Sequence, residues 1–340
     1  MRGGKLRPFL IRKSFGINVV IILTGAAGFI GSCILARLNA LGRGDIYLVD
    51  EMNHDSKKRN IENKKFKKFI DKKEFLKLVK SRQVDGSVEA VIHMGACSST
   101  LLRDAQYYEE NNYEYTKVLA EWALEHRIRF IYASSAATYG DGSCGYKDDE
   151  ATLRRCKPLN FYGQSKQKFD EWVLEHSVIN QLAGLKFFNV FGPNEYHKGD
   201  MRSVIAKAYD RVAKEGRISL FKSYKEEYKD GEQKRDFIYV KDAVDVVLFF
   251  LENPKINGIF NLGSGKARTW NDLAKALFAA VGKPLHIDYI DMPAHLRQQY
   301  QYFTEADMTK LFQCGYKKIF TPLEEAVYDY VQYLKHHAYL

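Results

Sequence analysis

The chain has 340 residues, of which 46% are hydrophobic and 28% are charged, as is ordinary for a globular protein. Its longest apolar runs, such as 246–251, are far too short to cross a bilayer. Residues 1–16 are basic but lack the uninterrupted apolar stretch of a signal peptide. We therefore expect a cytoplasmic protein without a membrane partner.

The cysteines and the net charge exclude two further classes of protein. The five cysteines are widely spaced and form no C-x-x-C pair, which predicts neither a disulfide framework nor a metal site. Much of the net charge of +10 comes from lysine pairs between residues 57 and 73, a pattern typical of a solvated surface or of a region that attracts phosphorylated ligands. No nucleic-acid-binding motif is present, so we expect no nucleic-acid partner.

Strands and helices alternate through the first half of the chain. Apolar strands are predicted at 18–23, 46–50, 90–94 and 130–133, and helical periodicity appears at 32–41 and 112–126. This alternation predicts an α/β fold, namely a Rossmann-type doubly wound parallel sheet covered by helices on both faces. A smaller, interleaved α/β substrate domain is expected in the second half.

Changes in composition predict the domain boundaries. A basic leader at 1–17 precedes a dinucleotide-binding domain at 18–188, to which the chain returns at about 236–262. Residues 189–235 and about 263–340 are expected to form most of the substrate-binding domain.

A glycine-rich turn predicts a dinucleotide site. Gly25, Gly28 and Gly31 follow the first strand and open the first helix, and the second strand ends in Asp50. In this arrangement the first glycine permits the tight turn, the second admits a pyrophosphate, and the third lets the helix pack on the strand. Asp50 favours NAD because it can bind the adenosine ribose, whereas the nearby cations beginning at Lys57 suit the 2′-phosphate of NADP. The residues alone leave this choice open.

A tyrosine and a lysine predict the catalytic chemistry. Tyr162 and Lys166 are four residues apart and would lie on one face of a helix. A nearby ammonium lowers the pKa of a phenol, which lets tyrosine exchange a proton with a substrate hydroxyl. Ser135 follows a predicted strand and would supply a hydroxyl to the same substrate oxygen. This set is the pattern of the extended short-chain dehydrogenase/reductases.

Longer segments resemble a narrower family, the ADP-L-glycero-D-manno-heptose 6-epimerases. The most specific segments are Gly-Ala-Cys-Ser-Ser-Thr at 95–100 and His-Lys-Gly at 197–199. The resemblance runs from about Val19 nearly to the C-terminus, and its other segments lie at 132–140, 157–163, 188–193, 234–237, 259–263 and 300–304.

The resemblance implies an activity. Tightly held NADP would take a hydride from C6″ of an ADP-heptose and return it to the opposite face, in the synthesis of lipopolysaccharide core precursors. Tyr162 and Lys198 match the two family acid/base groups, and Lys166 and Ser135 match supporting positions. Inversion requires a proton partner for each orientation of the hydroxyl, so two such groups are chemically sensible. The family also implies a homo-oligomer, namely a pentamer.

The resemblance assigns the contact residues as well. With the glycines, those facing the cofactor are Gly25, Gly28, Phe29, Ile30, Gly31, Asp50, Glu51, Lys57, Lys72, Met94, Gly95, Ala96, Cys97, Ser98, Asn111, Tyr162, Lys166 and Val190. Those lining the substrate site are Asn189, Asp200, Lys207, Phe221, Lys222, Ser223, Tyr224, Arg235 and Tyr300. Arg235 has an independent argument, because a planar guanidinium binds a diphosphate through two parallel hydrogen bonds.

Three positions depart from the family pattern. Glu51 stands where the family usually has asparagine, which places a carboxylate beside the expected 2′-phosphate and keeps NAD possible. Asp200 replaces a small hydroxyl residue, and Lys207 replaces a histidine of the substrate site. Either change could alter how the sugar or the diphosphate is held.

Two alternative functions follow from the same residues. Another nucleotide-sugar epimerase, of the hexose 4-epimerase type, would not need Lys198. A dehydratase usually carries an Asp-Glu pair where this chain has Ala136 and Ala137. A non-catalytic dinucleotide sensor would have no reason to keep Ser135, Tyr162, Lys166 and Lys198 together.

Overall fold

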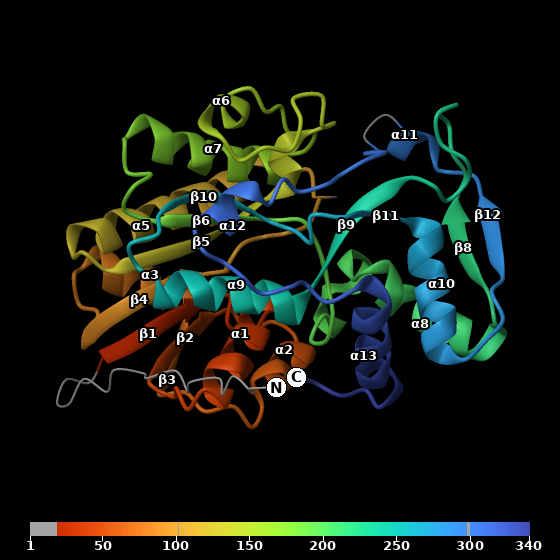
Figure 1. Ribbon diagram of the computed structural model, residues 1–340. Coiled ribbons are helices and arrows are strands. Elements are labelled where there is room, and N and C mark those ends of the chain that lie inside the picture. Colours follow the sequence, from red (N-terminus) through yellow and green to blue (C-terminus); the bar gives the residue numbers. More distant parts are fainter. Residues whose placement is uncertain (1–18, 101, 298–299) are drawn as a thin grey trace, which may run out of the picture.

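A seven-stranded parallel sheet forms the centre of the computed structural model, which describes residues 19–100, 102–297 and 300–340 (Figure 1). The strand order is β10-β6-β5-β4-β1-β2-β3. The bounds are β1 Val19–Thr24, β2 Ile46–Asp50, β3 Lys68–Asp71, β4 Ser87–His93, β5 Arg129–Ser135, β6 Ala183–Phe187 and β10 Gly258–Leu262. The chain order reverses between β1 and β4, so a crevice opens beyond their carboxyl ends. The predicted doubly wound α/β class is confirmed; the predicted leader, 1–17, lies outside the described residues.

Helices cover both faces of this sheet (Figure 1). Helix α1 (Phe29–Ala40) packs against α9 (Val240–Glu252) on one face, while α3 (Lys72–Lys80), α5 (Tyr115–Glu125) and α7 (Phe161–Glu175) lie on the other. Strand β1 is consequently apolar on both sides, and its residues 20–23 are almost fully buried.

The second half of the chain builds a smaller α/β region beside the main sheet. Strands β7 (Asn189–Phe191), β9 (Lys234–Tyr239) and β11 (Ala267–Thr269) form a three-stranded sheet, and β8 (Ile218–Phe221) pairs with β12 (Ile287–Ile290). Its helices are α8 (Val204–Glu215), α10 (Trp270–Val281) and α13 (Leu323–Lys335). The chain returns to the main sheet through α9 and β10, whereas β9, within the predicted return at about 236–262, pairs in the small sheet.

Short elements connect these parts. They are α2 (Asp55–Ile61), α4 (Ala105–Tyr108), the π-helix η1 (Glu109–Glu114), the 3-10 helix η2 (Ala136–Tyr139), α6 (Glu150–Leu153), the 3-10 helix η3 (Tyr196–Met201), α11 (Ala294–Arg297) and α12 (Thr309–Gln313). Short segments of this kind have weak periodicity, and the sequence patterns predicted none of them as separate elements, although the helix predicted at 112–126 includes the end of η1.

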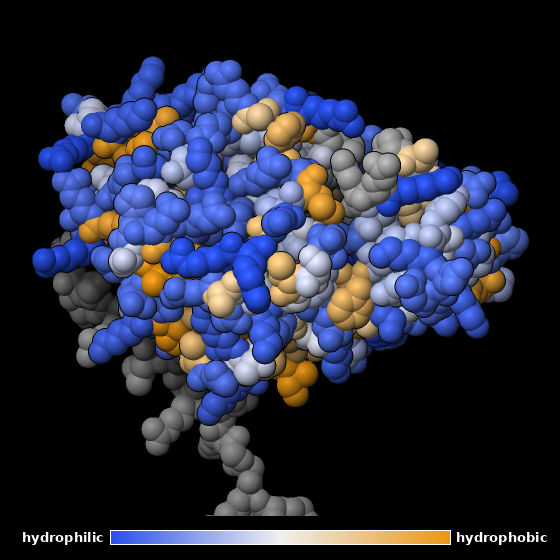
Figure 2. Space-filling model, turned by 90° about the horizontal axis from the view of Figure 1, so that it is seen from above, coloured by the Kyte–Doolittle hydropathy of each residue, from blue (hydrophilic) through white to orange (hydrophobic). Residues whose placement is uncertain are grey.

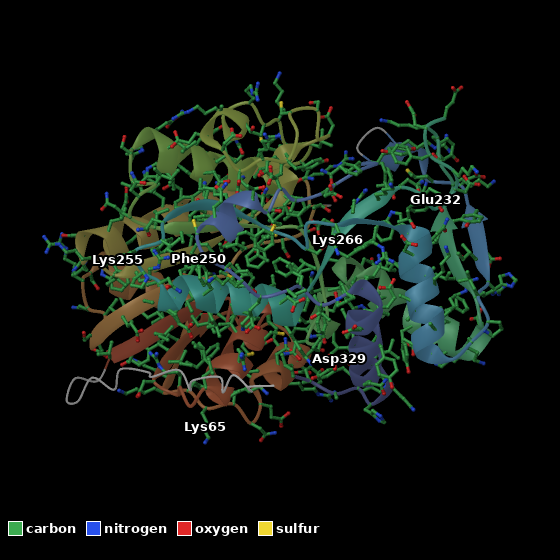
Figure 3. All side chains as sticks on the ribbon, in the orientation of Figure 1. Lys65, Glu232, Phe250, Lys255, Lys266 and Asp329 are labelled. Carbon is green, nitrogen blue, oxygen red and sulfur yellow. The ribbon has the colours of Figure 1, made fainter. Side chains whose placement is uncertain are left out.

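Charged and polar side chains cover most of the face seen in Figure 2, and apolar side chains are scattered over it. The side-chain view shows Phe250 of α9 against the main sheet, where its ring lies 4.7 Å from that of Phe260 (Figure 3). Within the described ranges, no helix has the length and apolar character needed to span a membrane. All five cysteines are free thiols.

Candidate active site

A cavity of about 990 Å³ lies between the carboxyl edge of the main sheet and the smaller region. Its walls come from the β1–α1 turn, the ends of β2, β4 and β5, the start of α7, and the segment that carries η3. This is the crevice where open α/β sheets bind their ligands.

The β1–α1 turn is shaped by glycines. Gly25 has φ +64°, and a Cβ there would lie 2.7 Å from the amide nitrogen of Gly95. A Cβ at Gly31 would lie 2.1 Å from the carbonyl oxygen of Gly25, so α1 packs directly on the turn. Phe29 and Ile30, in the first turn of α1, line the cavity. The N-terminus of α1 therefore faces the cavity. The turn therefore fits a dinucleotide pyrophosphate.

Two ion pairs occupy the end of the cavity at β2. The Asp50 carboxylate accepts hydrogen bonds from the Ala27 amide at 2.8 Å and from Lys57 Nζ at 2.9 Å. Glu51 pairs with Lys72 at 2.9 Å, and this hydrogen bond lowers the pKa of Glu51. Both lysines expected at a 2′-phosphate are thus already paired with carboxylates, and the local charge of the four groups is balanced.

The π-helix η1 places an asparagine that sequence reasoning missed. Asn112 donates to the carbonyl of Cys97 at 3.0 Å and accepts from the Cys97 amide at 2.8 Å. It also donates to Ser165 Oγ of α7 at 3.0 Å. Asn112 therefore ties the loop after β4 to the catalytic helix, and the neighbouring Asn111 lines the cavity as predicted. A π-helix has no clear sequence pattern but often marks a functional site.

Helix α7 begins at Phe161 and carries both Tyr162 and Lys166 on the side that faces the cavity. Lys166 Nζ donates to the carbonyl of Ala133 in β5 at 2.7 Å. Burial lowers the pKa of Lys166 to about 8, and the charge of Asp170 opposes this shift.

The state of Tyr162 differs from the expectation. Burial raises the pKa of the Tyr162 phenol, and a hydrogen bond from Ser135 lowers it in part. The sequence predicts that the Lys166 ammonium lowers the pKa of Tyr162. This effect is absent in the structure, because Lys166 Nζ is turned toward the backbone of β5. Tyr162 is therefore a neutral hydroxyl donor near neutral pH.

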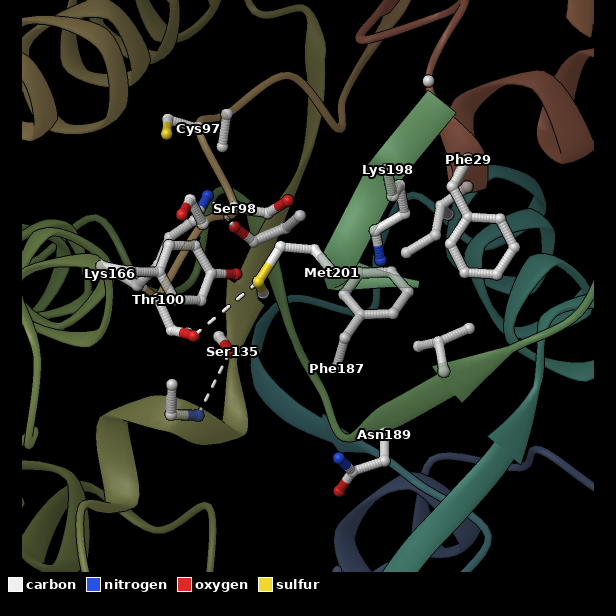
Figure 4. Close-up of a pocket in the computed structure, with 18 of the residues that line it drawn as sticks. Phe29, Cys97, Ser98, Thr100, Ser135, Lys166, Phe187, Asn189, Lys198 and Met201 are labelled. Carbon is white, nitrogen blue, oxygen red and sulfur yellow. Dashed lines mark hydrogen bonds between the residues drawn. The ribbon is translucent and has the colours of Figure 1, made fainter. Parts of the chain in front are cut away.

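Lys198 lies on the opposite side of the cavity. The 3-10 helix η3 is kinked at Gly199, with φ 53° and ψ −125°, and the kink directs Lys198 inward. Figure 4 shows Ser135 and Lys166 on one side, Lys198 and Phe29 on the other, and Met201 between them. Lys198 Nζ lies 5.1 Å from the centre of the Phe29 ring. Burial lowers the pKa of Lys198, with Glu195 opposing, and no described carboxylate forms an ion pair with it.

Arg235 on β9 is a buried cation without a counter-ion among the described residues. Its side chain is 6% exposed, and its guanidinium donates to the carbonyl of Lys234 at 2.9 Å. The rings of Tyr300 and Trp270 flank it at 5.0 Å and 5.8 Å. A guanidinium placed in this way can bind an anion, and a diphosphate matches its geometry.

The structure brings most of the predicted residues to this cavity. All predicted cofactor and catalytic residues line it, as do Asn189, Phe221, Arg235 and Tyr300. Five predicted substrate residues do not: Asp200, Lys207, Lys222, Ser223 and Tyr224. Lys207 donates to the Asp200 carbonyl at the surface, and Tyr224 donates to Asp291, so these side chains meet neighbours outside the cavity.

Several lining residues were not predicted. His197, Met201, Trp270 and Gln301 face the cavity, and only the position of His197 beside Lys198 could have indicated one of them. The parts of the chain that the structure describes hold no group of three or more histidine, cysteine or acidic residues able to bind a metal.

The sheet, the glycine turn and the Ser-Tyr-Lys set define an extended short-chain dehydrogenase/reductase. Residues 21–263 match the NAD dependent epimerase/dehydratase family, and the chain belongs to it. The cofactor is therefore a nicotinamide dinucleotide. More particularly, the chain is similar to the ADP-L-glycero-D-manno-heptose-6-epimerase of Nitratidesulfovibrio vulgaris, with 52% identity over 92% of this chain and 97% of that protein.

Solved structures share this fold. The Helicobacter pylori ADP-L-glycero-D-manno-heptose-6-epimerase superimposes with a TM-score of 0.76 at 25% identity, covering 93% of this chain and 96% of that one. The Thermus thermophilus UDP-glucose 4-epimerase, solved with NAD, has a TM-score of 0.72 at 23% identity, covering 93% and 99%. The predicted family resemblance is confirmed, and the chain is an enzyme of the isomerase class.

Proposed function

We propose that the enzyme interconverts ADP-D-glycero-β-D-manno-heptose and its L-glycero epimer at C6″, in the supply of precursors for the lipopolysaccharide core. The position of Lys198 across the cavity from Ser135 and Lys166 carries this proposal (Figure 4), since Tyr162 lines the same cavity one helical turn before Lys166. In the two epimers the hydroxyl on the inverted carbon faces opposite walls of the site. Each wall therefore needs its own group to exchange a proton with that hydroxyl.

The residues divide the proton transfers between them. A nicotinamide dinucleotide held at the glycine turn would supply the hydride transfer at C6″. Tyr162, assisted by the hydrogen bond from Ser135, exchanges a proton with the hydroxyl in one orientation. Lys198 does so in the other orientation, and burial eases the loss of its proton by lowering its pKa. Met201, between the two walls, excludes water from the transient carbonyl.

Arg235 is proposed to hold the substrate diphosphate. Its guanidinium lacks a counter-ion among the described residues, and it lies between the rings of Tyr300 and Trp270, which keep its plane fixed. A fixed, buried guanidinium binds a diphosphate strongly because little side-chain freedom is lost on binding.

We propose NADP as the cofactor, held by Lys57 and Lys72 at the end of β2. Both side chains line the cavity beside Asp50 and Glu51. The oxygens of a 2′-phosphate would replace the two carboxylates as the partners of Lys57 and Lys72. We also propose a cytoplasmic location and a homo-oligomer, a pentamer by family resemblance.

The test is an NMR experiment on the purified enzyme with ADP-D-glycero-β-D-manno-heptose and no added cofactor. We expect the L-glycero epimer to form on a retained cofactor, whose mass after denaturation identifies it as NADP or NAD. Absence of the epimer, even with either cofactor added, would contradict the proposal.

Two variants separate the alternatives. Lys198→Met and Tyr162→Phe should each lower the rate of epimerisation about 100-fold or more, as loss of a general acid or base does. If Lys198→Met stays fully active on a UDP-hexose, the enzyme is a 4-epimerase of the hexose type. Cofactor retention without turnover of any nucleotide sugar would indicate a sensor.

A further inference from the structure

A fully buried ion pair lies beneath the catalytic helix. Lys186 Nζ on β6 donates to Asp170 Oδ2 on α7 at 2.6 Å, and both side chains are 0% exposed. Burying two charges is unfavourable unless hydrogen bonds satisfy them, and replacing such a pair by apolar residues is often neutral or stabilising. Stability alone therefore gives no reason for this pair.

Further hydrogen bonds hold both members of the pair. Asp170 accepts from Tyr132 at 2.9 Å and from Ser134 at 2.6 Å, both on β5, while Lys186 also donates to Thr138 at 2.7 Å. Burial and the Asp170 charge raise the pKa of Tyr132 well above its usual value, so its hydroxyl remains a donor. The carboxylate is thus held in one position.

That position is one helical turn beyond Lys166. Tyr162, Lys166 and Asp170 are spaced by four residues along α7 and share one face of the helix. Asp170 accepts a hydrogen bond from Ser134 on β5. Lys166 donates to the carbonyl of Ala133, the residue before Ser134 on the same strand. Ser135 follows on the same strand.

We propose that Asp170, held by Lys186, is a positioning residue that keeps Lys166 charged and seated in the active site. This inference deepens the proposed function, because Lys166 belongs to that site. The charge of Asp170 favours the ammonium of Lys166, whereas Lys186 partly cancels this effect. Burial lowers the pKa of Lys166, and the pair modifies the pH at which Lys166 loses its charge.

Other polar and titratable groups face Lys166, Asp170 and Lys186, but none of them supplies the negative charge of Asp170. From the neighbouring elements these groups are Tyr162 on α7, His93 on β4, Tyr132, Ser134 and Ser135 on β5, Thr138 and Tyr139 on η2, and Cys156 after α6. Burial keeps His93 neutral by lowering its pKa to about 3, and it raises the pKa of Cys156 to about 11. Asp170 is the carboxyl group of this set.

The experiment measures the titration of Lys166 by NMR in protein carrying isotope-labelled lysine, with the resonance assigned from Lys166→Met. This readout needs no sugar, so it remains valid if the proposed substrate is wrong. Asp170→Asn should lower the pKa of Lys166 by about one unit, and Lys186→Met should raise it by about one unit. A purely structural role would hydrate Lys166 and raise its pKa in both variants.

Activity gives the second readout. The alkaline limb of the pH profile of kcat should move in the same direction as the Lys166 titration in each variant. If Asp170→Asn does not fold, the double variant Asp170→Asn/Lys186→Met leaves no buried charge unpaired and should still titrate below the parent enzyme. An unchanged or raised titration in the variants that lack Asp170 would overturn the proposal.

A matched control is available on α13. Asp329 pairs with Lys241 at 2.6 Å and lies away from α7 (Figures 1 and 3). Asp329→Asn also removes one paired carboxylate, but it should leave the titration of Lys166 unchanged. A shift of equal size in this control would show that the effect is not specific to Asp170, and would overturn the proposal.

Discussion

Glu51 is the side chain that most directly opposes a 2′-phosphate. Its carboxylate binds Lys72 at 2.9 Å, at the end of the cavity where Asp50 binds Lys57. Glu51→Asn should free Lys72 and remove a negative charge, raising affinity for NADP relative to NAD about fivefold. Binding of both dinucleotides to cofactor-stripped enzyme tests this. As a control, Glu89→Gln removes a carboxylate outside the cavity, and it should leave the ratio unchanged.

The buried His93 should make stability depend on pH. It lies between Thr24 and Thr116, at 2.6 Å and 2.9 Å, and burial lowers its pKa to about 3 from 6.5. Below pH 6.5 the imidazole therefore binds a proton in the unfolded chain but not in the native protein. The free energy of unfolding consequently decreases as the pH falls toward 3. By pH 4.5 this loss should reach about 2–3 kcal/mol.

Denaturant unfolding at pH 7 and pH 4.5 measures this dependence. The variant His93→Gln should be less stable at pH 7, yet it should lose less stability on acidification than the parent. Equal losses in the two proteins would show that His93 makes no contribution.

At the scale of elements, α1 packs very closely on the glycine turn. A Cβ at Gly31 would lie 2.1 Å from the carbonyl oxygen of Gly25, so Gly31→Ala must push α1 away. We expect a loss of about 1–3 kcal/mol in stability and poor cofactor retention. Thermal unfolding and cofactor absorbance after purification measure both effects.

Gly44→Ala is the matched control. A Cβ at Gly44 would meet only the Cβ of Lys65, at 3.6 Å, which is ordinary contact. This variant should keep its cofactor and its melting temperature. If Gly31→Ala behaved in the same way, close packing at the turn would not matter for cofactor binding.

The predicted elements were those with strong local patterns. The apolar run at 18–23 and the helical pattern at 32–41 correspond to β1 and α1. The π-helix η1, the kinked η3 and the two small sheets were not predicted, because their shapes depend on contacts between distant segments.

For the whole molecule, the interleaving of the two regions should make unfolding cooperative. Helix α9 and strand β10 return to the main sheet between β9 and β11 of the smaller one, so neither region can complete its sheet alone. We expect one unfolding transition, with far- and near-ultraviolet circular dichroism coinciding. Two separated transitions would show that the regions unfold independently.

The sequence by itself determined the class of fold, the glycine turn with Asp50, and the set of Ser135, Tyr162 and Lys166. These features depend on neighbours along the chain, since a turn, a helix face and a strand end are local. Residues from across the chain, such as Lys198, were placed only through the family resemblance.

Only the tertiary structure decided what depends on distant contacts. It set Lys198 opposite Ser135 and Lys166, paired Lys57 and Lys72 with carboxylates, and left Arg235 buried without a counter-ion among the described residues. It also buried Asp170 and Lys186 beneath Lys166. Burial and partner distance set the charge of an ionisable group, and both arise only when strands and helices from the whole chain meet.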